Sequence, residues 1–256
     1  MSRDILELQG GIIYGPINSR RLGSSLGLNI LPPGYKACPF NCAYCQYGFT
    51  TAKGFLVESD GTDLPTIDEI VMALTDALDE YPSVAYITFS GNGEPTLHPD
   101  FDCIVDEVKI LRDKFAPQAK TAILSNSAFV SRENVRRALS KLDARFMKLD
   151  AGDEETFKKY NRVNPKIKFA DIVDGLKKMD DIIIQALFAG GEGGNYNDYV
   201  IEKWIEKIDE IKPVECHIYS LDRPSADKRL TVINREGLKI ISDKAAERVG
   251  VTVRVF

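Results

Sequence analysis

Residues 34–49 read GYKACPFNCAYCQYGF and contain three of the chain's five cysteines, Cys38, Cys42 and Cys45. Their spacing is C-x3-C-x2-C, and the aromatic residue Tyr44 precedes the third cysteine. A short loop with this spacing can place three thiolates at three corners of one cubane cluster. Protein [4Fe–4S] clusters normally take four thiolates. One iron of a cluster held by this loop would therefore lack a protein ligand and remain open to another molecule.

A zinc site and a disulfide framework are the other two uses of such cysteines. Structural zinc usually has four ligands in paired spacings, and no second pair is present, since His98 and His217 lie far from the loop. An odd number of cysteines, 5, and an N-terminus without a secretory leader do not favour disulfides. We interpret Cys103, in an amphipathic helix pattern, and Cys216, in a strand pattern, as small core residues.

The composition is that of an ordinary soluble globular protein, with 44% hydrophobic and 28% charged residues. No apolar run approaches the ~20 residues of a membrane-spanning helix, and the first residues form no signal-peptide core. These patterns predict a cytoplasmic protein without membrane association, in a reducing compartment that suits an oxygen-sensitive cluster. The net charge of −5 argues against a broad nucleic-acid surface, but it leaves a local basic patch open, with Arg20, Arg21 and residues 158–168 as candidates.

Apolar strand patterns alternate with amphipathic helix patterns along the chain. We expect strands at 11–15, 27–31, 84–89, 121–124, 146–149, 182–188, 215–221 and 251–256, and helices at 66–81, 101–115, 131–142, 168–179, 198–211 and 235–248. Thr66 and Glu69 are placed to form a capping box, and Ser131 is the expected N-cap of the third helix. Six of these strands, from 27–31 to 215–221, alternate with helices. This alternation predicts a parallel sheet with right-handed crossovers. The pattern alone does not separate a doubly wound sheet from a barrel.

Polar residues follow the predicted strands at their C-terminal ends, where parallel α/β folds carry functional groups. Gly91-Asn92-Gly93-Glu94 follows the strand at 84–89, and its two glycines let the backbone approach a ligand closely. The alternative is a plain tight turn with an exposed Glu94. Ser125 and Asn126 follow the next strand and can hydrogen-bond a ligand, or form a turn before the third helix.

Three further strand ends carry candidates. Asp150 can bind a ribose, orient a substrate amine or cap the segment that begins at Asp153. Gln185 lies inside an apolar run, so we expect its amide to face the interior of the sheet, in a ligand contact or a structural hydrogen bond. Tyr219 lies near the end of the strand expected at 215–221, and Arg223 follows that strand. Arg223 can bind a carboxylate or phosphate, or form a salt bridge with the neighbouring Asp222 or another acid.

The cysteine loop resembles the signature of the radical S-adenosylmethionine (SAM) superfamily, C-x3-C-x-Φ-C, in which Φ is aromatic. The resemblance implies a [4Fe–4S] cluster whose open iron is chelated by the amino and carboxylate groups of SAM. It implies that one electron breaks a sulfonium C–S bond and leaves a 5′-deoxyadenosyl radical. It also implies an α/β fold of the partial (β/α)6 TIM-type barrel kind.

The same resemblance implies roles for the strand-end residues. Gly91, Asn92, Gly93 and Glu94 correspond to the GGE motif that meets the SAM ammonium, with Asn92 in place of the second glycine. Ser125 and Asn126 would bind the ribose or carboxylate of SAM, together with Asp150 and Gln185. Tyr44 would lie near the adenine or pack over the cluster.

Three other stretches, 15–27, 149–165 and 219–224, are similar to the wyosine-synthase-like group, and the likeness covers about residues 11–225. The tRNA-wyosine synthases of that group condense pyruvate with a methylated guanosine in tRNA. They carry further cysteines upstream, whereas this chain has none before Cys38. The resemblance implies a radical SAM enzyme, an oxidoreductase or transferase, whose unidentified substrate includes an RNA base among the candidates. Arg20, Arg21, Tyr219 and Arg223 are the expected substrate contacts.

Two alternatives remain open at this point. One is a radical SAM enzyme that acts on a small metabolite, peptide or protein, including glycyl-radical activation, and the other is a non-catalytic Fe–S protein. We expect residues 1–256 to form a single domain, with an N-terminal extension (1–24), a core barrel (25–225) and a C-terminal helix and strand (226–256). The resemblance further implies an external one-electron reductant of the flavodoxin or ferredoxin type. We expect a monomer or a homodimer.

Overall fold

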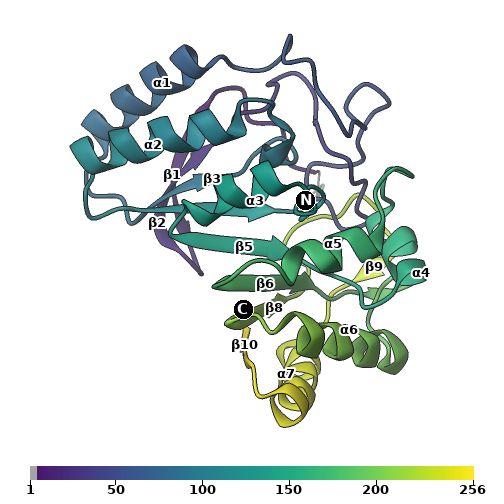
Figure 1. Cartoon of the computed structure of the whole chain (residues 1–256). Helices are drawn as coiled ribbons and strands as arrows, with labels where there is room; N and C mark the ends of the chain where they lie inside the picture. The colour runs from purple at the N-terminus through teal and green to yellow at the C-terminus, as the bar shows by residue number, and fades with distance from the viewer. Residues whose placement is uncertain (1–4) are drawn as a thin grey trace.

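The computed structural model describes residues 5–256 and contains one large curved sheet (Figure 1). Its eight strands lie in the order β1-β2-β3-β4-β5-β6-β8-β10. They are β1 (Ile13–Ser19), β2 (Gly23–Leu28), β3 (Tyr86–Phe89), β4 (Lys120–Ser125), β5 (Ala144–Lys148), β6 (Ile182–Leu187), β8 (Glu215–Tyr219) and β10 (Thr252–Val255). All neighbours pair in parallel except β1 and β2, which form an antiparallel hairpin. The parallel run from β2 to β8 is the partial barrel predicted from the sequence.

The helices wrap around one side of this sheet (Figure 1). They are α1 (Ile67–Glu80), α2 (Phe101–Phe115), α3 (Glu133–Ser140), α4 (Glu154–Thr156), α5 (Phe169–Leu176), α6 (Asp198–Ile211) and α7 (Arg235–Val249). Two short turns of other types, η1 (Pro95–Leu97) and η2 (Phe157–Asn161), are 3-10 and π-helical. A small antiparallel pair joins β7 (Gly190–Gly191) to β9 (Leu230–Thr231). Within residues 5–256, none of the helices has the length and apolarity that crossing a membrane requires.

The capping box predicted for the first helix is confirmed. The Thr66 hydroxyl accepts the Glu69 N–H at 3.3 Å, and the Glu69 carboxylate accepts the Thr66 N–H at 2.8 Å. Buried Ile70, Leu74 and Leu78 then recur along one face of α1, where they join the main core. Reciprocal capping satisfies two backbone N–H groups that have no acceptor within the helix. Helix α1 therefore begins where the sequence indicates.

Three expectations about local structure were wrong. The third helix begins at Glu133 after Arg132, and Ser131 does not cap it, because turns closed by Ser127 and Phe129 carbonyls occupy the preceding residues. Cys103 is exposed, since the buried stripe of α2 runs through Phe101, Ile104, Val105, Val108 and Leu111 and leaves position 103 outside it. Strand β1 continues past Pro16, which an edge strand with an irregular register tolerates. Cys216 is buried, as expected.

Three neighbouring strands of the sheet carry a row of polar residues. Lys148, Gln185 and His217 stand in register on β5, β6 and β8. Below them, Leu22 packs with Ala122 and Phe146 in a small apolar cluster of its own. The sheet therefore carries polar side chains on three neighbouring strands beside a small apolar cluster.

His217 is a buried neutral base in this row. Its ring lies 5.5 Å from the ring of Phe146 and 4.7 Å from that of Phe256, measured between centroids, and neither ring nitrogen has a hydrogen-bond partner among the described residues. Glu215 approaches to 3.4 Å, but its carboxylate pairs with Arg254. Burial, with the charges of Arg21 and Arg254, lowers the pKa of His217 to about 4.

A His217→Phe variant is therefore expected to flatten the pH dependence of stability. His217 binds a proton near pH 6.5 in the unfolded chain but only near pH 4 in the folded chain. The contribution of His217 to the free energy of unfolding is therefore fully present above pH 6.5, and it is lost as the pH falls from 6.5 towards 4. We expect the wild type to lose about 1 kcal/mol more than the variant between pH 7 and pH 5, after allowance for solvent screening. Urea unfolding followed by circular dichroism at both pH values measures this difference. Equal losses in the two proteins would contradict the assignment.

Candidate functional site

The cysteine loop docks against the Gly91–Glu94 loop at the end of β3. The Ala37 N–H donates to the Asn92 carbonyl at 2.9 Å, and the Glu94 N–H donates to the Ala37 carbonyl at 3.0 Å. Gly93 adopts a φ of 146°, and a Cβ at this position would lie 1.8 Å from the Ala37 carbonyl oxygen. The close approach that the glycines permit is thus made by the cysteine loop itself.

Asn92 replaces a glycine of the motif, and its buried side chain has structural partners. Its amide nitrogen donates to the carbonyls of Gln9 and Pro32, both at 2.9 Å, and its amide oxygen accepts the Gln9 N–H at 2.8 Å. Its backbone N–H donates to the side chain of Asn29 at 3.0 Å. Asn92 therefore ties the N-terminal segment to the site, and its side chain and backbone N–H are both engaged by the protein.

The opposite side of the cysteine loop is held by two distant segments. The N–H groups of Asn41 and Ala43 donate to the carbonyls of Asn161 and Tyr160, at 3.0 and 2.9 Å. The backbone after β8 adds two more bonds, from Ala226 to Cys45 at 3.1 Å and from Asp227 to Ala43 at 2.8 Å. Arg229 and Arg162 both pair with the Asp227 carboxylate and hold its pKa well below the usual range. The position of the loop is thus fixed by residues that sequence analysis did not assign to the cysteine loop.

Each cysteine sulfur of the loop receives an N–H from a different side chain. The donors are Asn126 to Cys38 at 3.3 Å, Asn161 to Cys42 at 3.4 Å and Lys36 to Cys45 at 3.2 Å. Cys38 and Cys42 are buried, and Cys45 is partly exposed. Of the three donors, only Asn126 had been expected at the site. The short loop therefore presents three sulfurs that already have polar partners.

These sulfurs suit a metal cluster better than free thiols. Burial raises the pKa of Cys42 to about 11 and that of Cys38 to about 12, so the thiolates need a positive charge to form at neutral pH. A bound metal supplies it and deprotonates a ligating thiol outright. In the described part of the chain, no three His, Cys, Asp or Glu side chains converge as ligands of one ion. Cluster thiolates each bind a separate iron and do not converge on one ion. Three cysteine sulfurs on one short loop, each with its own N–H donor, are the donor set that a cluster takes.

Glu94 joins the first two strand-end loops. It is 1% exposed, and its carboxylate accepts hydrogen bonds from the Ser125 hydroxyl at 2.8 Å, the Asn126 N–H at 2.6 Å and the Thr96 hydroxyl at 2.5 Å. Burial raises its pKa, although these donors oppose the shift. The alternative of an exposed Glu94 was wrong. The structure brings together the two loops that the sequence had nominated separately.

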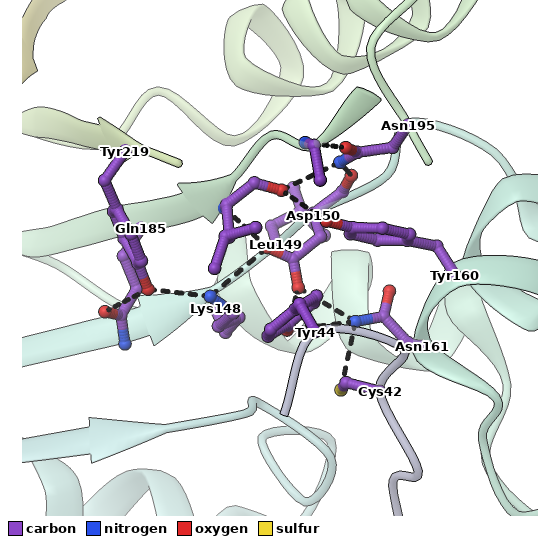
Figure 2. A network of polar contacts seen from close by, with 12 residues as sticks. Cys42, Tyr44, Lys148, Leu149, Asp150, Tyr160, Asn161, Gln185, Asn195 and Tyr219 are labelled. Atoms are coloured by element: carbon purple, nitrogen blue, oxygen red, sulfur yellow. Dashed lines mark hydrogen bonds and ion pairs between the residues drawn. The ribbon is translucent and has the colours of Figure 1, made fainter. Parts of the chain in front are cut away.

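A second polar network surrounds Asp150, and Figure 2 shows it. One carboxylate oxygen accepts the Tyr44 hydroxyl at 2.5 Å and the Asn161 amide at 2.8 Å, and the other accepts the Leu187 N–H at 2.8 Å. Lys148 lies 3.3 Å from the latter oxygen. Both oxygens of Asp150 therefore have protein partners, and Asp150 positions the phenol of the cysteine loop.

Lys148 was missed in the sequence. Its ammonium donates to the Tyr219 hydroxyl at 2.7 Å and lies over the rings of Tyr44, at 4.6 Å, and Tyr219, at 4.8 Å. Although burial opposes it, the pKa of Lys148 is raised because Asp150 and Tyr219 stabilise the charged form. The sequence did contain a signal for Lys148. Residues 148 and 150 lie two apart at a strand end, so Lys148 is expected on the same face as Asp150.

The residues expected to contact substrate fall into two groups. Arg21 donates to the Gln185 amide oxygen at 2.9 Å and lies 4.8 Å over the Tyr219 ring, so both expected residues Arg21 and Tyr219 reach the network of Asp150. Gln185 also donates to the Phe146 carbonyl at 3.2 Å and faces the interior, as expected. The other two, Arg20 and Arg223, are exposed at the surface.

Asp222 pairs with Arg20 at 2.9 Å, where the sequence had offered Arg223 as its partner. This expectation was wrong because the tip of the β1–β2 hairpin brings position 20 to the segment after β8. Both side chains of the pair remain mostly exposed, at 64% and 65%. The pair therefore links two surface segments.

Comparison with known proteins supplies the family. Residues 33–200 match the family model described as the radical SAM superfamily. A Brachyspira hyodysenteriae protein named GTPase Obg is 29% identical over 238 residues, which are 89% of this chain and 32% of that protein. A UPF0026 protein of Methanocaldococcus jannaschii is 30% identical over 224 residues, 85% of this chain and 65% of that protein. The chain thus spans less than two thirds of either relative.

Among solved structures, one titled as TYW1 with a bound lysine-pyruvate adduct has a similar fold. Its TM-score is 0.62 and its sequence identity 16%, over 89% of this chain and 75% of that one. At this identity the likeness concerns the fold.

Proposed function

The chain belongs to the radical SAM superfamily, and from that premise we propose that it is a radical SAM enzyme. Its cofactor site would be a [4Fe–4S] cluster on Cys38, Cys42 and Cys45. When bound, the cluster would supply one electron for reductive cleavage of SAM to a 5′-deoxyadenosyl radical, which abstracts hydrogen from a substrate. The observation that carries the proposal is the buried cysteine loop, whose three sulfurs each receive a separate N–H donor.

The residues around the loop would bind and orient SAM. The backbone of Gly91–Glu94 and the groups of Ser125 and Asn126, which lie near Cys38, would bind the amino and carboxylate end of SAM. Tyr44 would lie near the adenine, and Asp150 would hold Tyr44 in place by accepting its phenolic hydroxyl. Burial of this side of the loop would exclude water from the radical. The protein would thus contribute position and protection, while the cofactor performs the difficult step.

We propose that the substrate binds beside the linked side chains of Arg21, Lys148, Gln185 and Tyr219. The wyosine-synthase-like stretches 15–27, 149–165 and 219–224 supply residues to this set or to its immediate partners, which supports a relationship to that group and an RNA base as one candidate substrate. Because Asp150 favours the ammonium form of Lys148, we assign Lys148 the role of a cation that binds an anionic group. A small anionic metabolite fits these charges as well.

Other parts of the proposal follow from the family. An external one-electron reductant of the flavodoxin or ferredoxin type would load the cluster, and residues 1–256 would act as one domain. In that domain β10 extends the same sheet as the core strands. A non-catalytic Fe–S protein is the competing class, and SAM cleavage separates the two.

Anaerobic reconstitution tests the proposal. The protein is treated with iron and sulfide, then with SAM and dithionite, and the nucleoside product is identified by mass spectrometry. We expect about four irons per chain and 5′-deoxyadenosine that requires both SAM and reductant. If four irons bind but SAM stays intact, the cluster is structural or electron-carrying and the enzyme assignment fails.

A further inference from the structure

Lys36 is a buried cation next to the cysteine loop. It is 6% exposed, and its ammonium donates to the Cys45 sulfur at 3.2 Å and to the Gly48 carbonyl at 2.9 Å. In the part of the chain that the structure describes, it forms no ion pair with a carboxylate, and the ionisable groups acting on it are the three loop cysteines. Lys148, the other lysine at the site, has Asp150 as a partner.

A buried ammonium without a counterion is strongly unfavourable. The loop offers a counterion only when its cysteines are thiolates. Three thiolates around a [4Fe–4S]2+ core leave a net charge of about −1, and one added electron makes it about −2, before any charge on SAM is counted. The attraction to a fixed positive charge grows with the negative charge it faces. A cation at position 36 therefore stabilises the reduced cluster more than the oxidised one.

We propose that Lys36 is a positioning residue that raises the reduction potential of the cluster, so that an external donor can reduce it. The inference rests on the proposed function, because it requires the cluster. Net charge and hydrogen bonds to the sulfurs are among the properties that set Fe–S potentials. Asn126 and Asn161 also donate to loop sulfurs but carry no charge, so the effect of Lys36 should be the largest of the three.

The reduction potential of the anaerobically reconstituted protein tests this role. Lys36→Met removes the charge at similar side-chain length, and Lys36→Arg retains it. Lys109→Met is the matched control, because the Lys109 ammonium also donates to a backbone carbonyl, that of Lys141 at 2.7 Å, but lies on α2. The ratio of reduced to oxidised cluster is followed by electron paramagnetic resonance while the applied potential is varied, with iron content and circular dichroism measured in parallel.

At the wild-type midpoint, we expect Lys36→Met to lower the ratio of reduced to oxidised cluster at least about tenfold, which is ~59 mV for one electron. Lys36→Arg and Lys109→Met should stay within about twofold. Equal potentials in Lys36→Met and wild type would overturn the proposal. If only Lys36→Met loses its cluster, the charge is required for assembly and the electrostatic role is supported.

If Lys36→Arg loses its cluster as well, the side chain acts by fit and the proposal fails. A wild-type protein that binds no four-iron cluster would instead sink the proposed function itself. The two failures are therefore distinguishable.

Discussion

Replacing Cys42 by alanine is expected to abolish cluster binding and to lower 5′-deoxyadenosine formation by more than about 100-fold. Loss of a mere hydrogen-bond partner of a metal ligand costs up to about 100-fold, and loss of the ligand itself should cost more. Cys42 is one of only three thiols in the loop, so its loss would leave two anchors for the proposed cluster, one iron of which has no protein ligand even in the wild type. Its sulfur lies in a buried position beside Asn161, which offers a neutral amide and no replacement thiolate. Iron content, visible absorption and product analysis after reconstitution measure both effects.

Cys103→Ala is the matched control for this variant. Cys103 is exposed on α2, outside the loop, so the same chemical change there should leave iron content and product formation unaltered. A Cys42→Ala protein that still bound four irons and cleaved SAM would show that another group completes the site, and the assignment of the triplet would be wrong.

Those parts of the fold that depend on local pattern could be predicted from the sequence. Helices α2 and α6 have the predicted bounds, and α1 begins at its capping box, because periodicity and caps are encoded within a few residues. The parts that depend on distant contacts could not. The β7–β9 pair joins two-residue segments with no strand pattern, and the π-helical turn at Phe157–Asn161 is marked by no residue type.

The same division applies to the candidate site. The spacing of the cysteines nominates the loop, and polar residues at strand ends nominate the Gly91–Glu94 segment and Ser125-Asn126, which the structure brings together through the Glu94 carboxylate. Lys36 and Asn161 had no such signal. A lysine is usually exposed, and Lys36 becomes a site residue only because the folded loop buries it. Asn161 reaches Cys42 only because η2 presents it there.

The remaining large effect concerns Asp150. Asp150→Ala is expected to lower the free energy of unfolding of the apo protein by about 3–5 kcal/mol, the cost of breaking a buried ion pair. The change leaves the mostly buried side chain of Lys148 without its carboxylate partner, and it removes the acceptor for Tyr44, Asn161 and the Leu187 N–H. Urea unfolding followed by circular dichroism measures the loss. The exposed pair of Lys239 and Asp243 provides the control, since Asp243→Ala should cost no more than about 1 kcal/mol.

A double-mutant cycle with Lys148→Met separates the ion pair from the other hydrogen bonds. If the uncompensated ammonium causes most of the loss, the double variant should be more stable than the sum of the two single losses implies, by at least about 1 kcal/mol. Strict additivity would mean that the hydrogen bonds to Tyr44 and Asn161 dominate. In that case Asp150 would serve mainly to hold the cysteine loop, and iron binding would fall in Asp150→Ala but not in Lys148→Met. A loss in Asp150→Ala no larger than in Asp243→Ala would contradict both accounts.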